Sequence, residues 1–264
     1  MRFYGWKVIN AMIKYKSNSV SIINSKNINK PNEDFYLCDD DRGIYLLFDG
    51  VSRDKINGMY PNPSPSFDVS KLFVKSVYKF LLENINENAD ISVLLHNAIK
   101  KGNDEINEYN SKKEWIDNFL PGTVGIIAVI RDCKLFFAYI GDCYGLVISN
   151  KGDKTIFTQC QTEKIANHKK EFSAYEIRNK ICNNESHPYS YGVLNGDFRA
   201  MNFIKYDTID ILSNDKIIIC SDGFSDIIKN VSGKKLYQMT IDQMTTRANE
   251  SDDKTMVIIE EDRW

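Results

Sequence analysis

Acidic residues stand at the ends of the most apolar segments of this sequence. Glu33 and Asp34 directly precede the run FYLC, and Asp49 with Gly50 directly follows the run IYLLF. If the two runs pair as antiparallel strands, about 4.8 Å apart, these carboxylates share one small volume. Converging carboxylates repel one another unless they are protonated or neutralised by cations. The spacing therefore predicts a cation site at this strand end.

Other apolar runs also have an acidic residue at one end. Asp142 follows KLFFAYIG, Asp222 follows KIIICS, and Asp252 with Asp253 precedes KTMVII. A single Asp-Gly after a strand is most often a turn, but several independent strand ends that deliver acid favour a shared metal site. Oxygen ligands without histidine or thiolate favour Mg²⁺ or Mn²⁺ over zinc or copper.

The composition narrows the class of protein. The chain has 264 residues, with 34 Lys and Arg against 36 Asp and Glu, so we expect one domain over residues 1–264 and no nucleic-acid partner. No apolar run approaches the roughly 20 residues that span a bilayer, and the N-terminus lacks a signal-peptide pattern, so we expect no membrane association. The six cysteines form no CxxC pair, which favours free thiols and a cytoplasmic location.

The elements that must position these acids can be read from hydrophobic periodicity. Three turns, at residues 39–42, 131–133 and 213–215, each separate two apolar runs, which predicts three hairpins. Apolar residues three and four apart predict one helix from about Val69 to Leu81 and a second from the N-cap Asp90 to about Asn110. Continuous apolar strands are buried on both faces. The expected fold is therefore α+β, a four-layer α/β/β/α sandwich of two antiparallel sheets flanked by helices.

The motifs also carry a family resemblance. The segments NEDFYLC, LLFDG, GTVG, FAYIGD, IIICSDGFSD and SDDKTMVII occur in the order and roughly the spacing of the type 2C metal-dependent protein phosphatases. The resemblance spans about residues 32–260, nearly the whole chain, and the set is specific although FDG or GD alone is weak. The sandwich of two antiparallel sheets that this family has agrees with the fold expected from the hairpins.

The resemblance implies a role for each acid. Asp49 would bridge two metal ions, the Gly50 carbonyl and Glu33 would bind one of them, and Asp222 and Asp252 would bind the other. Two further acids, Asp34 and Asp253, would orient metal-bound waters. Together with Asp222, Asp142 would hold a third, weaker ion. Near these acids, Thr123 would have a supporting role, and residues 160–197 would form a variable flap beside the site.

The implied reaction is hydrolysis of phosphoserine or phosphothreonine. Two metal ions would lower the pKa of a bridging water, and the resulting metal-bridging hydroxide would attack the phosphorus, with Asp49, Asp222 and Asp34 as the catalytic carboxylates. The expected partner is a phosphorylated protein that a Ser/Thr kinase supplies. Two alternatives stay open: a pseudophosphatase that only binds a signalling partner, and a dinuclear phosphoesterase that acts on a small phosphate ester.

Two positions depart from the family pattern. Val51 stands where eukaryotic members often have a histidine, and Asn29 stands where the family has a phosphate-binding arginine. If this stretch is extended, successive side chains point to opposite faces, so we expect Lys30 to point away from the site and to be a poor substitute. Arg53 follows the Asp49-Gly50 pair in the chain, and its guanidinium can bind two phosphate oxygens. We therefore hypothesise that Arg53 holds the substrate phosphate; the alternative is a solvated loop charge.

The Arg53 hypothesis has a kinetic test. Arg53→Ala is expected to lower kcat/KM by at least about tenfold, which corresponds to about 1.4 kcal/mol of transition-state stabilisation. Steady-state phosphate release measures the loss, with Asn29→Arg as the comparison variant. An Arg53→Ala enzyme with unchanged kcat/KM, together with a more active Asn29→Arg enzyme, would show that the site works without a clamp.

Overall fold

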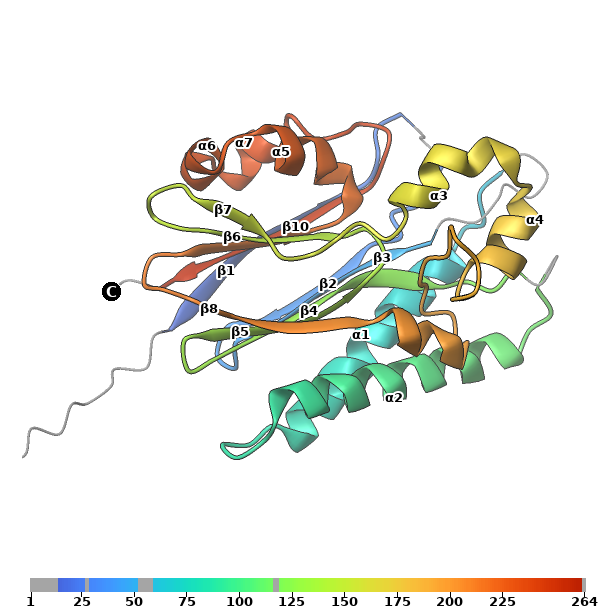
Figure 1. Cartoon of the computed structure of the whole chain (residues 1–264), viewed down its shortest axis with the longest axis horizontal. Coiled ribbons are helices and arrows are strands. Elements are labelled where there is room, and N and C mark those ends of the chain that lie inside the picture. The colour runs from blue at the N-terminus through green and yellow to red at the C-terminus, as the bar shows by residue number, and fades with distance from the viewer. Residues whose placement is uncertain (1–13, 27–28, 52–58, 116–118, 263–264) are drawn as a thin grey trace, which may run out of the picture.

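The computed structural model describes residues 14–26, 29–51, 59–115 and 119–262. In these residues ten strands form two antiparallel sheets that pack face to face (Figure 1). Sheet 1 has the order β1 (Tyr15–Ile22), β10 (Lys254–Glu261), β9 (Lys216–Cys220), β6 (Tyr144–Ile148) and β7 (Lys154–Ile156). Sheet 2 has the order β2 (Phe35–Asp39), β3 (Ile44–Gly50), β4 (Thr123–Arg131), β5 (Lys134–Ile140) and β8 (Lys205–Asp210).

Two long helices cover the outer face of sheet 2. They are α1 (Pro65–Asn84) and α2 (Ile91–Ser111), and Asp90 caps α2 by accepting from the backbone N–H groups of Ser92 and Val93, as expected. The apolar stripe of α1, which includes Val69, Phe73 and Val77, packs on the outward side chains of β3 and β4. Burial of such a stripe, and not helix propensity, supplies most of the stability of helices in proteins.

The two sheets enclose a second apolar layer. Alternate residues of the central strands point into it, including Tyr45 and Leu47 of β3 and Ile217 and Ile219 of β9. The residues between them point to the opposite faces, so these strands are apolar on both sides. This arrangement explains why the sequence shows continuous apolar runs instead of alternation.

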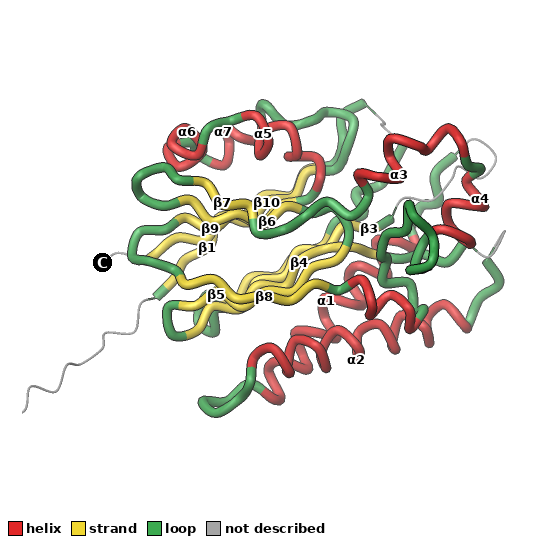
Figure 2. The backbone as a smooth tube through the Cα atoms, in the orientation of Figure 1, coloured by secondary structure: helices red, strands yellow, loops and turns green. Residues whose placement is uncertain are grey.

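Three short helices cover the outer face of sheet 1. They are α5 (Ser225–Asn230), α6 (Gly233–Gln238) and α7 (Ile241–Thr245), and they bury Ile227, Leu236 and Met244 against β6, β9 and β10. The layers therefore run helix, sheet, sheet, helix, as Figure 2 shows, which confirms the expected four-layer fold. No helix in the described ranges is long and apolar enough to cross a membrane.

The third predicted hairpin is wrong. The first two are present, since β2 pairs with β3 and β4 pairs with β5. However, β8 pairs with β5 in sheet 2, whereas β9 pairs with β6 and β10 in sheet 1. Residues 211–215 therefore carry the chain from one sheet to the other, and Asn214 has a positive φ of 71° in this connection. The half-exposed β8 suits a sheet edge, and the fully buried β9 suits a sheet centre.

The packing of α1 can be tested at two adjacent leucines. Leu81 is fully buried against sheet 2, whereas Leu82 is 39% exposed. Leu81→Ala is expected to lower the free energy of unfolding by about 2–5 kcal/mol, because it removes buried methyl groups and leaves a cavity. Leu82→Ala, in the same turn of the helix, is the control and is expected to cost less than about 1 kcal/mol. Denaturant titration of both variants measures the difference, and equal losses would contradict the placement of α1.

Candidate metal centre

The end of β3 and the entry to β2 lie side by side. The Gly50 N–H donates to the Glu33 carbonyl over 3.1 Å, and the Glu33 carboxylate accepts from the Ser64 hydroxyl. Ser64 is also the N-cap of α1, where its Oγ accepts from the Ser66 N–H. A Cβ on Gly50 would lie only 2.8 Å from the Glu33 carbonyl oxygen, so this approach requires glycine. The start of α1 therefore fixes the direction of the Glu33 carboxylate.

The backbone of Asp49 is held from the neighbouring strand. The Thr123 hydroxyl, which is fully buried, donates to the Asp49 carbonyl over 2.8 Å and accepts from the Ser70 hydroxyl over 3.0 Å. Ser70 lies in α1, so one chain of hydrogen bonds joins the helix, β4 and β3. Thr123 thus supports the strand that presents Asp49.

Asp34 is buried beside β9. Its Oδ2 accepts from the Ser221 hydroxyl over 2.9 Å, and the residue is only 4% exposed. Its Oδ1 is buried and has no hydrogen-bond partner among the described residues. A buried carboxylate oxygen without a partner is costly, so a cation or water is the expected neighbour.

The turn after β9 brings Asp222 against the start of β10. Asp222 begins the short 3₁₀ helix η5 (Asp222–Phe224), and Gly223 packs so closely on the chain that a Cβ there would lie 2.2 Å from the Asp253 carbonyl oxygen. Asp222 therefore lies near the Asp252-Asp253 pair. Its Oδ1 is also buried, without a hydrogen-bond partner in the part of the chain that the structure describes. Two of the predicted site acids thus present unsatisfied oxygens.

Asp142 is hydrogen-bonded to the segment that follows β7 in the chain. Its Oδ2 accepts from the Thr162 hydroxyl over 2.9 Å. Just before it, the Gly141 N–H donates to the Gln161 side chain over 3.1 Å, and the Gln161 N–H donates to the Gly141 carbonyl over 2.9 Å. The beginning of the 160–197 segment is therefore attached to the strand end that carries Asp142.

The carboxylates act on one another electrostatically. Burial raises the pKa of Asp49 well above its ordinary value, and the charges of Asp34, Asp222, Asp142 and Asp252 raise it further. Burial also raises the pKa of Asp222, and the charges of Asp142, Asp252 and Asp34 raise it further. Each raised pKa indicates that the surroundings do not fully compensate the negative charge of the carboxylate. The structure thus brings the predicted acids within electrostatic reach of one another.

These residues fit hard divalent ions better than a cage made only of protein ligands. Among the described residues, no three His, Cys, Asp or Glu side chains gather closely enough to form the ligand shell of one ion. The described side chains therefore do not bring Asp49, Asp222 and Asp252 together as closely as the resemblance implies for one ion. Mg²⁺ keeps several waters and can be held by one or two direct carboxylates. Asp49, Asp142, Asp222 and Asp252 are partly exposed, which leaves room for such waters. The donor chemistry and the unpartnered oxygens therefore fit Mg²⁺ or Mn²⁺.

The prediction that Lys30 points away from the acids is wrong. Its ammonium lies 3.2 Å from Asp252 Oδ1 and 3.4 Å from Asp253 Oδ2. Residues 29 and 30 form a turn and a bend instead of a strand, so the alternation of side chains does not apply. Asn29 is exposed in this turn. Arg53 lies outside the described residues, so its role stays a hypothesis.

Two positioning residues were missed by the sequence reasoning. Ser64 precedes Pro65 at the first position of α1, which is a recognisable N-cap signal. Nothing in that signal reveals the second contact, to Glu33. Thr162 has no comparable signal, because its partner Asp142 lies 20 residues away.

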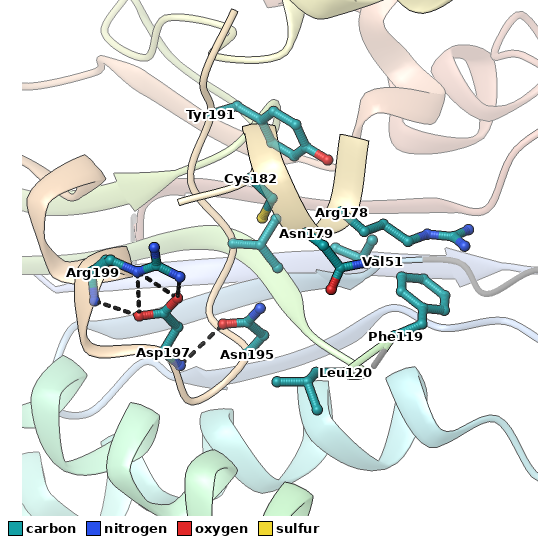
Figure 3. Close-up of a pocket in the computed structure, with 11 residues that line it drawn as sticks. Val51, Phe119, Leu120, Arg178, Asn179, Cys182, Tyr191, Asn195, Asp197 and Arg199 are labelled. Atoms are coloured by element: carbon teal, nitrogen blue, oxygen red, sulfur yellow. Dashed lines mark hydrogen bonds and ion pairs between the residues drawn. The ribbon is translucent and has the colours of Figure 1, made fainter. Parts of the chain in front are cut away.

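A pocket of about 290 Å³ lies beside this end of the sandwich (Figure 3). Val51, which directly follows Gly50, lines one side of it. The opposite side comes from the chain after α4 (Ala174–Glu176) and includes Arg178 and Tyr191. The Arg178 guanidinium stacks on the Phe119 ring, 3.4 Å from its centroid. The full lining is Val51, Phe119, Leu120, Arg178, Asn179, Cys182, Tyr191, Val193, Asn195, Asp197 and Arg199.

The acids should make the metal-free protein sensitive to pH. Burial raises the pKa of Asp34 from 3.8 to about 7, so the folded chain holds a proton that the unfolded chain has released. This proton stabilises the folded chain relative to the unfolded one. The stabilisation is complete below pH 3.8, the pKa of Asp34 in the unfolded chain, and is lost as the pH rises through about 7, its pKa in the folded chain. In EDTA, the free energy of unfolding is therefore expected to fall between about pH 4 and about pH 7. Denaturant titrations across this range measure it.

Asp34→Asn is the control for this titration. An asparagine oxygen can still accept from the Ser221 hydroxyl but has no proton to lose. The variant is expected to show a shallower decline with pH than the wild type. A wild-type stability that rises over the same range in EDTA would contradict the assignment.

Comparisons with known proteins agree with this fold. The chain is similar to the serine/threonine phosphatase PstP/Ppp of Mycobacterium tuberculosis (17% identity, 95% of this chain and 100% of that chain, TM-score 0.65). It is also similar to a PstP catalytic domain in complex with two manganese ions (16%, 94% and 98%, 0.65) and to PppA of Pseudomonas aeruginosa (14%, 94% and 98%, 0.64). No curated protein matches the chain. The family model for protein phosphatase 2C matches residues 27–258, so the chain belongs to the protein phosphatase 2C family.

Proposed function

We propose that this protein phosphatase uses Mg²⁺ or Mn²⁺, bound by the acids at one end of the sandwich, to remove phosphate from serine and threonine side chains of proteins. The observation that carries the proposal is the convergence of Asp49, Asp142, Asp222 and Asp252, whose strands belong to two different sheets. Family membership independently supports a phosphoprotein phosphatase.

The proposed ligands are Glu33, Asp49, the Gly50 carbonyl, Asp142, Asp222 and Asp252. Two bound ions would supply an activated water and offset the charge of the phosphate. A PstP structure holds two manganese ions, which supports this number of ions here. The choice between Mg²⁺ and Mn²⁺ stays open, since both prefer oxygen ligands.

The chain's own groups prepare this site. The Ser64 hydroxyl orients the Glu33 carboxylate, and the Ser221 hydroxyl orients Asp34. Burial raises the pKa of Asp34 in the metal-free chain.

The pocket beside the site is the proposed place for substrate residues that flank the phosphorylated one. The 160–197 segment, proposed as the flap, lines it together with Val51. A phosphorylated protein is the proposed substrate, supplied by a Ser/Thr kinase, and a cytoplasmic location stays a prediction. We infer that nucleic acid is not a partner, because the net charge of the chain is −2.

The two alternatives gain no support from the comparisons. A pseudophosphatase would have no need for the repulsion among Asp49, Asp142 and Asp222, which costs stability without a cation. The activity assay below separates all three readings.

Phosphate release from a phosphothreonine peptide is expected with Mn²⁺ or Mg²⁺ and not with EDTA. Asp222→Asn is expected to lower kcat by at least about a hundredfold, because Asp222 is a proposed ligand of more than one ion. Its fold should survive, since the change relieves repulsion. Asp226→Asn, four residues further on and exposed, is the matched control and should keep wild-type activity.

The same assay with para-nitrophenyl phosphate tests the substrate class. A higher kcat/KM for this small ester than for the phosphopeptide would contradict protein specificity. Absence of metal-dependent release from both substrates would favour the pseudophosphatase. Wild-type activity in Asp222→Asn would overturn the proposed ligands.

A further inference from the structure

A buried ammonium lies inside the acid cluster. The Lys30 side chain is only 10% exposed, and its Nζ contacts Asp252 Oδ1 at 3.2 Å and Asp253 Oδ2 at 3.4 Å. An ammonium donates up to three hydrogen bonds and carries a fixed charge in this setting. Lys30 is therefore a cation that the chain itself supplies to the proposed metal centre.

Asp253 anchors this ammonium from the buried side. Asp253 is 2% exposed, and its Oδ1 accepts from the backbone N–H and the side-chain amide of Asn24, over 3.0 and 3.1 Å. Its Oδ2 accepts from the Glu33 N–H over 3.2 Å. With both oxygens engaged by the backbone around it, Asp253 cannot turn towards a metal ion without losing these bonds. The negative charge of Asp253 therefore pairs with the Lys30 ammonium.

Asp252 differs from Asp253 in exposure and in freedom. Its side chain is 36% exposed. The hydrogen bonds to its Oδ1 come from the Lys30 ammonium and from the adjacent Asp253 N–H. Asp252 can therefore face a metal ion in solvent, but the ammonium already neutralises part of its charge.

The charge compensation is uneven across the cluster. In the part of the chain that the structure describes, no lysine or arginine forms an ion pair with Asp34, Asp49, Asp142 or Asp222. The only cation of the described cluster therefore lies at the Asp252 end. Since a metal ion and an ammonium repel each other, an ion bound by Asp252 binds against the charge of Lys30.

We propose that Lys30 is a built-in competitor of the metal ion at Asp252: it neutralises Asp252 and Asp253 in the metal-free chain and weakens the binding of that ion. The inference rests on the proposed role of Asp252 as a metal ligand. It goes beyond that role because it names a residue of this chain that lowers the affinity of Asp252 for its ion.

Lys30→Met tests the proposal, with Lys26→Met as the matched control. Lys26 lies in the same loop but is exposed and pairs with the exposed Glu250 at 3.6 Å. Binding of Mn²⁺ is measured from the electron paramagnetic resonance of the free ion, without reference to activity. Lys30→Met is expected to bind the Mn²⁺ held by Asp252 at least about tenfold more tightly, a change of about 1.4 kcal/mol. Lys26→Met should match the wild type.

Thermal unfolding in EDTA provides the second measurement. Without its ammonium the metal-free Lys30→Met chain leaves the buried Asp253 charge unpaired, so its Tm is expected to fall below that of Lys26→Met. Added Mn²⁺ should then raise the Tm of Lys30→Met more than that of the wild type. If Lys30→Met does not fold, Lys30→Gln removes the same charge but keeps a hydrogen-bond donor, and the same results are expected.

The outcomes separate this inference from the proposed function. Wild-type binding of Mn²⁺ with weaker or unchanged binding by Lys30→Met overturns the competitor role and leaves the metal centre intact. An equal gain in Lys26→Met also overturns it, because the effect would then be one of overall charge. Absence of Mn²⁺ binding by every variant overturns the metal centre and the inference together. A Tm in EDTA that is unchanged by Lys30→Met overturns the neutralising role.

Discussion

The repulsion among carboxylates at one end of the sandwich is the constraint that the rest of the structure has to offset. Burial and mutual charge raise the pKa values of Asp49, Asp142 and Asp222 together, so the folded chain stores an unfavourable electrostatic free energy at this end. Three apolar layers, one between the sheets and one on each outer face, supply the compensating stability. The fold can tolerate the repulsion among these carboxylates because its large apolar core stabilises it.

The geometry that brings the acids together depends on close backbone contacts. Gly50 meets Glu33 and Gly223 meets Asp253 at distances that a side chain would not allow. Hydroxyl groups then set the directions of the carboxylates, with Ser64 on Glu33, Ser221 on Asp34 and Thr162 on Asp142. The hydroxyls come from a helix cap, a strand end and a loop. The site is thus built where several elements end, and no single element contains it.

Much of this fold could be predicted, because its signals are local. The runs on either side of residues 39–42 and 131–133 pair across short turns, and Asp90 caps its helix through its own neighbours. The failures are non-local. Pairing of β8 and β9 depends on which sheet offers each strand a partner, and α5 to α7 are too short for a clear apolar period.

The site residues also divide into those that local signals predict and those that depend on non-local contacts. The acids could be predicted from their positions beside apolar runs, whereas the contacts that orient them could not. Lys30 is the clearest case: the expectation for it assumed a strand, and a single bend in the chain reversed the direction of its charge. Ser64 could be predicted as a helix cap, but its contact with Glu33 joins residues 31 positions apart.

The attachment of the 160–197 segment to Asp142 has a thermodynamic consequence. Thr162 donates to the Asp142 carboxylate, and Gln161 is bonded to Gly141 in both directions, so this segment cannot shift at its start without disturbing an acid of the cluster. The same segment, further along, forms a wall of the pocket. Coupling between two sites is reciprocal in binding free energy. A molecule that fills the pocket and displaces this segment changes the affinity of Asp142 for a cation, and the cation changes the affinity of the pocket by the same factor.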